Sequence, residues 1–289
     1  MTRSRSVAFV LVLPWLLTLL VFWLFPLVVS FLMGFTDFRL LVKEYHWVGL
    51  VNYRSLWSDP DFIRALKNTF IFVFGTIPIT TILSLGLALL VNRQFRGRGF
   101  FRAAYFLPSI TSMVVIALIF TNLYRRGGYI ASLAGLAGFT PPEYGFLYDS
   151  GTALYSIMAM DIWMSVGYYM LIFLAGLKST PNELYEAAQI HGAGAIRQFF
   201  SLTLPLLRPV TLFILVISSI KSFQVFVEIF VMTKGNFDSA TAVYFIYETG
   251  LTTGFKFGDA SAAAYVLFVI IAVFSAIWFL LLRSRRALW

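Results

Sequence analysis

Six long apolar blocks separated by short charged segments constrain this chain more than any other feature of its sequence. Each block reaches the roughly 17–25 residues that a helix needs to cross the hydrocarbon core of a bilayer. Only 12% of the 289 residues are charged, about half the share usual in a soluble domain. The pattern predicts an all-α membrane protein with six transmembrane helices, at Val7–Met33, Thr69–Val91, Ala104–Leu123, Ala153–Leu177, Val210–Met232 and Ala262–Leu282.

The first block could be mistaken for a signal peptide, because Arg3 and Arg5 precede it. However, Val7–Met33 is longer than the roughly 7–15 residues of a signal h-region, and no small-residue cleavage site follows it. We therefore expect a retained first helix.

The distribution of basic residues predicts the orientation. With the N-terminus inside, the cytoplasmic segments contain twelve Lys and Arg residues against two acids, Glu183 and Glu186. The longer external segments contain nine basic and nine acidic residues. Cytoplasmic loops of membrane proteins are enriched in Lys and Arg, so both termini are expected in the cytoplasm. The same rule accounts for the net charge of +9 without a nucleic-acid partner.

These spans organise the chain as a single transmembrane domain over residues 1–289. A cytoplasmic loop is expected at 178–208, and extracytoplasmic segments at 34–68 and 233–261. The aromatic residues of the first external segment indicate a short folded or amphipathic excursion. In the second, Val243–Tyr247 is apolar but too short to span, so we expect it to pack at the interface.

Several chemistries are excluded by what the sequence lacks. There is no cysteine, no Gly-x-x-x-x-Gly-Lys-Ser/Thr phosphate loop, no His-Glu-x-x-His and no Gly-x-Ser-x-Gly. The only histidines are His46 and His191. We therefore predict that the chain is not an enzyme, and that it has no catalytic residue, metal site or cofactor of its own.

The cytoplasmic loop carries the most specific pattern. Its first part reads Glu186-Ala187-Ala188-Gln189-Ile190-His191-Gly192, and after nine residues Leu202-Thr203-Leu204-Pro205 follows. Good helix formers fill Glu183–Ile190, two glycines permit a sharp turn, and Ile196–Leu202 is amphipathic. The loop is thus predicted to form two short helices that could dock in a partner's groove. The alternative is an ordinary interfacial helix that covers the end of the bundle.

This pattern resembles the EAA loop of bacterial ABC importer permeases. Other segments, among them Trp47-Val48-Gly49, Asn52-Tyr53, Asn68-Thr69 and Gly258 with Ala260-Ser261-Ala262, resemble the carbohydrate-uptake permeases, and within them the maltose- and glycerol-3-phosphate-type first permease. His191 departs from the Asp that the family usually has there. The resemblance implies a type I importer transmembrane domain in a bacterial plasma (inner) membrane, with coupling residues Glu186, Ala187, Ala188, His191, Gly192, Leu204 and Pro205.

The resemblance also implies the partners. These are a second homologous permease, an ABC ATPase dimer on the cytoplasmic face that binds ATP and Mg, an extracytoplasmic solute-binding protein and the lipid bilayer. The solute would be a sugar, oligosaccharide, polyol or sugar-phosphate-like compound.

Ionisable residues inside a span are costly and are therefore functional candidates. Lys221, Gln224 and Glu228 are spaced i, i+3, i+7, which places them on one face of a continuous helix. Lys221 and Glu228 would lie about 10 Å apart along the axis, so Asp161 is an alternative partner for Lys221. Two hypotheses stand equally: a polar-solute pathway, or a buried ion-pair network that fixes helix packing. The candidate pathway residues are Asp161, Trp163, Tyr168, Tyr169, Lys221, Phe223, Gln224, Phe226 and Glu228.

Two other classes of function remain as alternatives. A self-sufficient secondary transporter predicts internal repeats and broken helices at matching positions, and the sequence shows no such repeat. A membrane-embedded enzyme acting on lipid or glycan needs a catalytic set at the interface, and neither Asp161 nor Glu228 has an evident partner base in the sequence. The permease of an ABC importer is the leading hypothesis.

Overall fold

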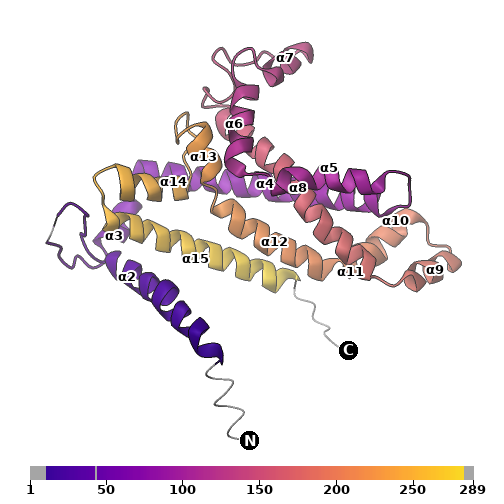
Figure 1. Ribbon diagram of the computed structural model, residues 1–289, viewed down its shortest axis with the longest axis horizontal. Coiled ribbons are helices and arrows are strands. Elements are labelled where there is room, and N and C mark those ends of the chain that lie inside the picture. The colour runs from indigo at the N-terminus through magenta and orange to yellow at the C-terminus, as the bar shows by residue number, and fades with distance from the viewer. Residues whose placement is uncertain (1–10, 43, 283–289) are drawn as a thin grey trace, which may run out of the picture. The chain divides into compact units, whose positions relative to one another are not determined.

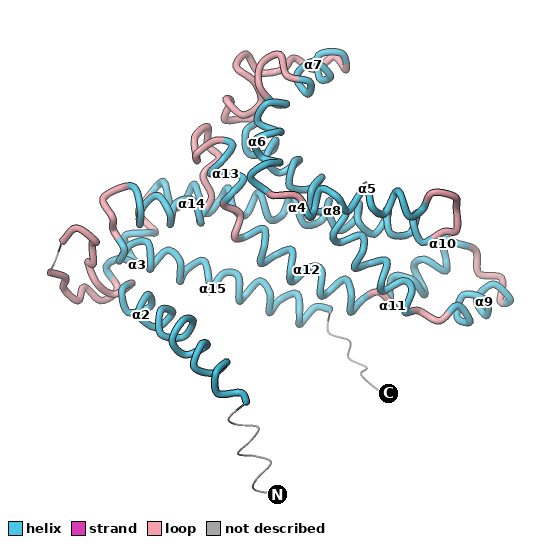
Figure 2. The backbone as a smooth tube through the Cα atoms, viewed as in Figure 1, coloured by secondary structure: helices cyan, strands magenta, loops and turns pink. Residues whose placement is uncertain are grey.

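The computed structural model describes residues 11–42 and 44–282, which are mostly helical (Figures 1 and 2). Within them, the extended pairings are isolated bridges such as Thr36 with Trp47. The labelled elements, where η marks a π-helix, are η1 (Leu19–Leu24), α2 (Phe25–Met33), α3 (Val51–Leu56), α4 (Pro60–Asn92), α5 (Arg98–Ile110), α6 (Met113–Tyr124), α7 (Tyr129–Leu136), α8 (Ala153–Ser179), α9 (Asn182–Ile190), α10 (Ala195–Gln198), η2 (Phe199–Thr203), α11 (Leu204–Leu206), α12 (Arg208–Phe223), α13 (Val227–Met232), α14 (Ala242–Tyr247), η3 (Glu248–Thr252) and α15 (Phe257–Leu282).

The chain is an all-helical membrane protein, and residues 11–42 and 44–282 contain five or six candidate spans. Five helical segments are long and apolar enough to cross a bilayer: Leu11–Met33, Pro60–Asn92, Ala153–Ser179, Arg208–Met232 and Phe257–Leu281. The bent pair of α5 and α6 provides a sixth if it counts as one span. Residues 7–10 of the first expected helix lie outside the described residues, as do Arg3, Arg5, Lys43, Arg283, Arg285 and Arg286.

The expected helix Ala104–Leu123 is corrected by the structure. α5 ends at Ile110 and α6 begins at Met113, with a bend of 96° between them. The backbone of Thr111 is extended (ψ 148°), and the Thr111 hydroxyl donates to the Leu107 carbonyl at 3.0 Å. Pro108 has no N–H to donate within α5, which weakens the helix at its last turn. The break therefore follows Pro108, a residue that hydropathy alone does not weigh.

The expected helix Val210–Met232 is also interrupted. α12 ends at Phe223 and α13 begins at Val227, and Phe226 leaves the helical region (φ −143°, ψ −55°). The hydroxyl of buried Thr241 donates to the Val225 carbonyl at 3.0 Å. That bond satisfies a carbonyl which the break removes from the helical ladder. The break is thus compensated by a residue from another segment, and Glu228 does not share one continuous helix with Lys221.

The chain divides into two compact units. The first comprises Met1–Ile63 and Phe245–Phe268. In this unit, Asn52 of α3 holds the turn that follows α2, because the buried Asn52 amide donates to the carbonyls of Gly34 (3.0 Å) and Thr36 (2.8 Å). Gly258 also lies against Thr36, where a Cβ would overlap the Thr36 carbonyl oxygen. The segments around Asn52 and Gly258, which carry the family resemblance, are thus brought together at one place.

Aromatic contacts complete this first unit. Phe35 stacks on Trp47 with ring centroids 5.5 Å apart. Tyr265 of α15 packs edge-on against Phe31 of α2 at 5.0 Å and donates its hydroxyl to the Leu27 carbonyl. The excursion expected in segment 34–68 is therefore built from α3, the start of α4 and the aromatic turn between α2 and α3.

The second unit comprises Arg64–Tyr244 and Val269–Trp289. α8 is the most deeply buried of the candidate spans and packs against α5, α6, α12 and α13. Figure 1 shows α5 running alongside α8. Gly167 permits this close approach, since a Cβ there would overlap the Tyr105 carbonyl oxygen of α5. Trp278 of α15 donates its ring N–H to the Ser219 hydroxyl of α12 at 3.1 Å.

Asn68 and Thr69 hold the loop that leads from α13 to α14. The Asn68 amide donates to the carbonyls of Asp238 (2.8 Å) and Ala240 (3.0 Å), and the Thr69 hydroxyl accepts from the Ala242 N–H (2.8 Å). These bonds fix the loop on α4, and the loop in turn presents Thr241 to the break after α12. A short polar pair on α4 is therefore linked, through this loop, to the backbone between α12 and α13.

Candidate functional site

Residues 178–208, the loop expected on the cytoplasmic side, form the two predicted short helices. α9 (Asn182–Ile190) agrees with the expected Glu183–Ile190, and α10 continues directly into η2 over the region expected to be amphipathic. Glu186 and His191 are exposed on this loop. Their exposure leaves both side chains available to a partner.

The turn between the two helices explains the glycine of the motif. Gly192 has φ +77°, a conformation that favours glycine. The Gly192 N–H donates to the Gln189 carbonyl and the Ala193 N–H to the Ala188 carbonyl, both at 2.9 Å. This pair of bonds is the Schellman motif that closes a helix C-terminus. Ala188 and Gly192 therefore have a definite local task, which is to end α9 and reverse the chain.

Side chains that the sequence analysis did not select brace the loop. The Gln198 amide donates to the Ala193 carbonyl at 2.6 Å. The hydroxyls of Tyr185 and buried Thr203 lie 3.1 Å apart and join α9 to η2. Leu204 and Pro205 then open α11, where proline is tolerated in the first turn. The only sequence feature that could have indicated Gln198, Tyr185 and Thr203 was their polar side chains within the predicted docking loop.

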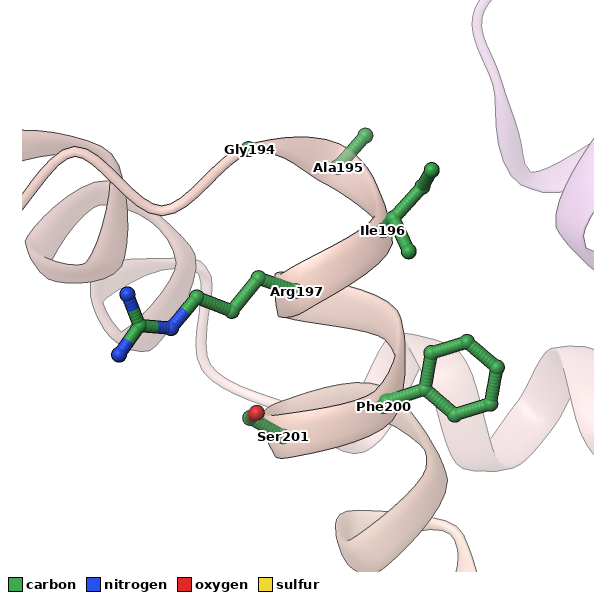
Figure 3. Close-up of a pocket in the computed structure, with 6 residues that line it drawn as sticks. All are labelled: Gly194, Ala195, Ile196, Arg197, Phe200 and Ser201. Atoms are coloured by element: carbon green, nitrogen blue, oxygen red, sulfur yellow. The ribbon is translucent and has the colours of Figure 1, made fainter.

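Large apolar side chains project from this loop. Ile190 is 85% exposed, Ile196 77% and Phe200 62%. In Figure 3, Ile196 and Phe200 extend from one side of the helix and Arg197 from the other. These three residues, with Gly194, Ala195 and Ser201, line an open hollow of about 680 Å³. An exposed apolar surface of this kind is suited to bind a protein partner.

A charged cluster joins α8 and α12. The Lys221 ammonium lies 2.8 Å from an Asp161 carboxylate oxygen and donates to the Ser165 hydroxyl at 2.6 Å. The Ser165 hydroxyl donates to the same Asp161 oxygen at 3.3 Å. The Asp161 side chain is 5% exposed and that of Lys221 41%. The alternative pairing of Lys221 with Asp161 is therefore the one observed. Ser165 was missed, although it lies one helical turn after Asp161.

The other candidate pathway residues divide between different surroundings. Gln224 and Tyr168 are exposed, whereas Tyr169 is buried in the α8 core. Glu228 is buried on α13. Trp163 lies 5.3 Å from the Phe120 ring and lines a separate apolar cavity of about 480 Å³.

The two phenylalanines near the break serve packing. Phe223 is fully buried, with its ring 5.5 Å from Phe70 and 5.2 Å from Phe274. Phe226 stacks near Phe230 at 5.4 Å. The structure thus places Lys221, Gln224 and Tyr168 at the surface of the subunit and does not bring all nine candidates together. Within the described part of the chain, no three His, Asp or Glu side chains are grouped to hold a metal ion.

Comparison with known proteins gives a family match. Residues 80–288 match the model of the family described as binding-protein-dependent transport system inner membrane component. The chain is 34% identical to the arabinooligosaccharides transport system permease protein AraP of Bacillus subtilis (strain 168), covering 95% of this chain and 88% of the relative. It is 30% identical to the trehalose/maltose transport system permease protein MalF of Thermococcus litoralis, covering 98% and 96%.

A solved structure has the same fold. It is a bacterial alginate ABC transporter in complex with alginate pentasaccharide-bound periplasmic protein, and one of its chains superposes with a TM-score of 0.84 at 23% identity. The superposition covers 97% of this chain and 95% of that chain. The match therefore extends over nearly the whole helical architecture.

Proposed function

The chain belongs to the binding-protein-dependent transport system inner membrane components, and from this premise we propose that it forms one half of the translocation pathway of an ABC importer for a sugar or oligosaccharide. It is a multi-pass inner membrane permease of the carbohydrate-uptake type, and it is a transport subunit rather than an enzyme. Relatives named for arabinooligosaccharides and for trehalose and maltose support a saccharide as the solute.

The observation that carries the proposal is the cytoplasmic loop. It combines exposed Glu186, a helix end closed by Gly192, and apolar Ile196 and Phe200 facing outward. We assign this surface to an ATPase subunit, which would hold ATP and Mg. Glu186 would pair with a cation of that subunit, and the apolar side chains would fill its groove. His191, exposed where the family usually has Asp, would lie at the edge of this contact.

The internal braces suit a loop that transmits movement. Gln198, Tyr185 and Thr203 hold its two helices together, so displacement of α9 by the ATPase would move η2 with it. η2 leads through α11 into α12, the helix that carries Lys221. In this way, ATP-driven closure of the ATPase dimer would displace α12 and so change the solute pathway.

The pathway itself would be completed by a second, homologous permease. The exposed groups of α8 and α12, Tyr168, Lys221 and Gln224, would face it across the water-filled route. A charged group in mid-span is expensive against lipid, which favours a polar cavity on this side. Both termini would lie in the cytoplasm, and a loaded binding protein would dock on the opposite face.

The test is recovery of the complex. A C-terminal tag, gentle extraction from the native membrane and mass spectrometry should recover a second permease together with a soluble P-loop ATPase. The matched control is a known importer complex extracted under the same conditions. Recovery of the chain alone, while the control complex survives, would contradict the proposal.

A further inference from the structure

We propose that the solute of this permease is an uncharged saccharide rather than a sugar phosphate or a uronate. The inference rests on the proposed function and narrows its substrate class. The family resemblance leaves both solute types open, and Lys221 by itself would favour an anion. The surroundings of Lys221 point the other way.

The positive charge of Lys221 is already compensated. Its ammonium lies 2.8 Å from the Asp161 carboxylate, which is 5% exposed and belongs to the facing helix α8. Ser165 accepts from the ammonium at 2.6 Å and donates to the same carboxylate at 3.3 Å. The cluster is therefore closed on its buried side. An anionic solute could approach Lys221 only in competition with the buried Asp161 carboxylate, and breaking such a pair leaves a buried charge uncompensated.

Other charges near the cluster strengthen this argument. The first turn of α13 carries Glu228, which is buried and would add negative charge if ionised. The nearest Lys or Arg residues along α8 and α12 are Lys178 and Arg208. At a rise of 1.5 Å per residue, they lie about 26 Å from Asp161 and about 20 Å from Lys221 along their helices. α6, α13 and α15 carry no Lys or Arg in their described residues. α4 and α5 do carry basic residues, but Thr76 of α4, which meets Ser222, lies nine residues after Lys67, and Ser109 of α5, which meets Met164, lies seven residues after Arg102. The charged side chains that the packed helices bring to the cluster itself are therefore acidic.

The exposed atoms of the cluster suit hydroxyl groups. An ammonium has three N–H donors, and the contacts to Asp161 and Ser165 use two of them. The third remains for a solute, and the side chain of Lys221 is 41% exposed. Gln224, one turn further along α12, is exposed and offers both a donor and an acceptor. Together they provide directional hydrogen bonds without a free charge, which matches a neutral saccharide.

The experiment measures weak sugar binding to the importer complex in nanodiscs, without the binding protein, by saturation-transfer NMR. The probes are maltotriose and arabinotriose, which are neutral, and an alginate trisaccharide and sn-glycerol 3-phosphate, which are anionic. Omitting the binding protein ensures that the preference belongs to the permease pair. We expect the neutral probes to bind at least tenfold more tightly than the anionic ones. Equal or tighter binding of the anionic probes would overturn the inference. Failure to recover the importer complex at all would instead contradict the proposed function on which the inference rests.

Variants of the ion pair test the cause. Asp161→Asn releases the charge of Lys221, so the ratio of anionic to neutral binding should rise at least fivefold. The double variant Asp161→Asn with Lys221→Gln removes both charges and should return the ratio to the wild-type value. An unchanged ratio in Asp161→Asn would refute the proposed role of Asp161. If the single variant does not fold, the comparison of wild type with the double variant decides. If removal of both charges in the double variant shifted the preference toward the anionic probes, that result would contradict the inference.

Discussion

The turn between α9 and α10 offers the sharpest test of the structural reasoning. Gly192 and Gly194 lie two residues apart, and a Cβ built on either meets no heavy atom within 4 Å. They differ in backbone conformation, with φ +77° at Gly192 and φ −69° at Gly194. Since alanine meets no steric obstacle at either position, a comparison of the two alanine variants reports on backbone conformation alone.

The expected effects differ in size. Alanine in the left-handed region costs roughly 1–2 kcal/mol, so Gly192→Ala should disfavour the closed turn by a factor of roughly 5–30. Gly194→Ala should cost less than Gly192→Ala, because φ −69° is ordinary for an L-residue and only the N-cap preference for glycine over alanine is lost. Gly192→Asn should fall between the two, since Asn tolerates the left-handed conformation better than other side chains.

The assay is saccharide uptake by cells that express the complete importer, with membrane yield and ATPase activity measured in parallel. We expect uptake to be highest in Gly194→Ala, lower in Gly192→Asn and lowest in Gly192→Ala, at similar membrane yield. In the Gly192 variants, the remaining ATPase activity should respond less to added solute than in the wild type. Limited proteolysis should cleave the Gly192→Ala loop fastest. Equal behaviour of Gly192→Ala and Gly194→Ala would refute the argument that φ decides.

Further perturbations address the contact surface and the two units. Glu186→Arg should lower uptake at least tenfold without changing membrane yield, because the side chain is exposed; normal uptake at normal yield would remove Glu186 from the coupling surface. Asn52→Ala breaks two buried hydrogen bonds and should cost about 2–4 kcal/mol, seen as a lower thermal midpoint in detergent, whereas exposed Asn122→Ala should leave the midpoint unchanged. Gly167→Ala forces a Cβ against the Tyr105 carbonyl and should cost about 1–3 kcal/mol. Its control, Gly86→Ala in α4, meets open space and should be neutral or stabilising by up to about 1 kcal/mol; equal thermal midpoints for these two glycine variants would argue against close packing of α5 on α8.

Composition and the spacing of residues were sufficient to predict the fold class and the family. A bilayer requires long apolar helices, so the spans could be predicted from runs of residues without knowledge of their packing. The local structure of α9 and the turn after it could also be predicted, because both depend on local preferences: helix formers up to Ile190 and a glycine at position 192, where φ is positive. Both features are local, and the sequence records local features directly.

The breaks in the spans and the partner of Lys221 were decided by tertiary contacts. The span is interrupted between Phe223 and Val227, and Thr241, held by a loop fixed on α4, donates to the Val225 carbonyl that the break frees. Lys221 pairs with Asp161, a residue sixty positions earlier, because α8 and α12 lie side by side. Helical spacing could identify residues that share a face, but it could not show which face of another helix they meet. That information resides only in the packing of segments distant in sequence.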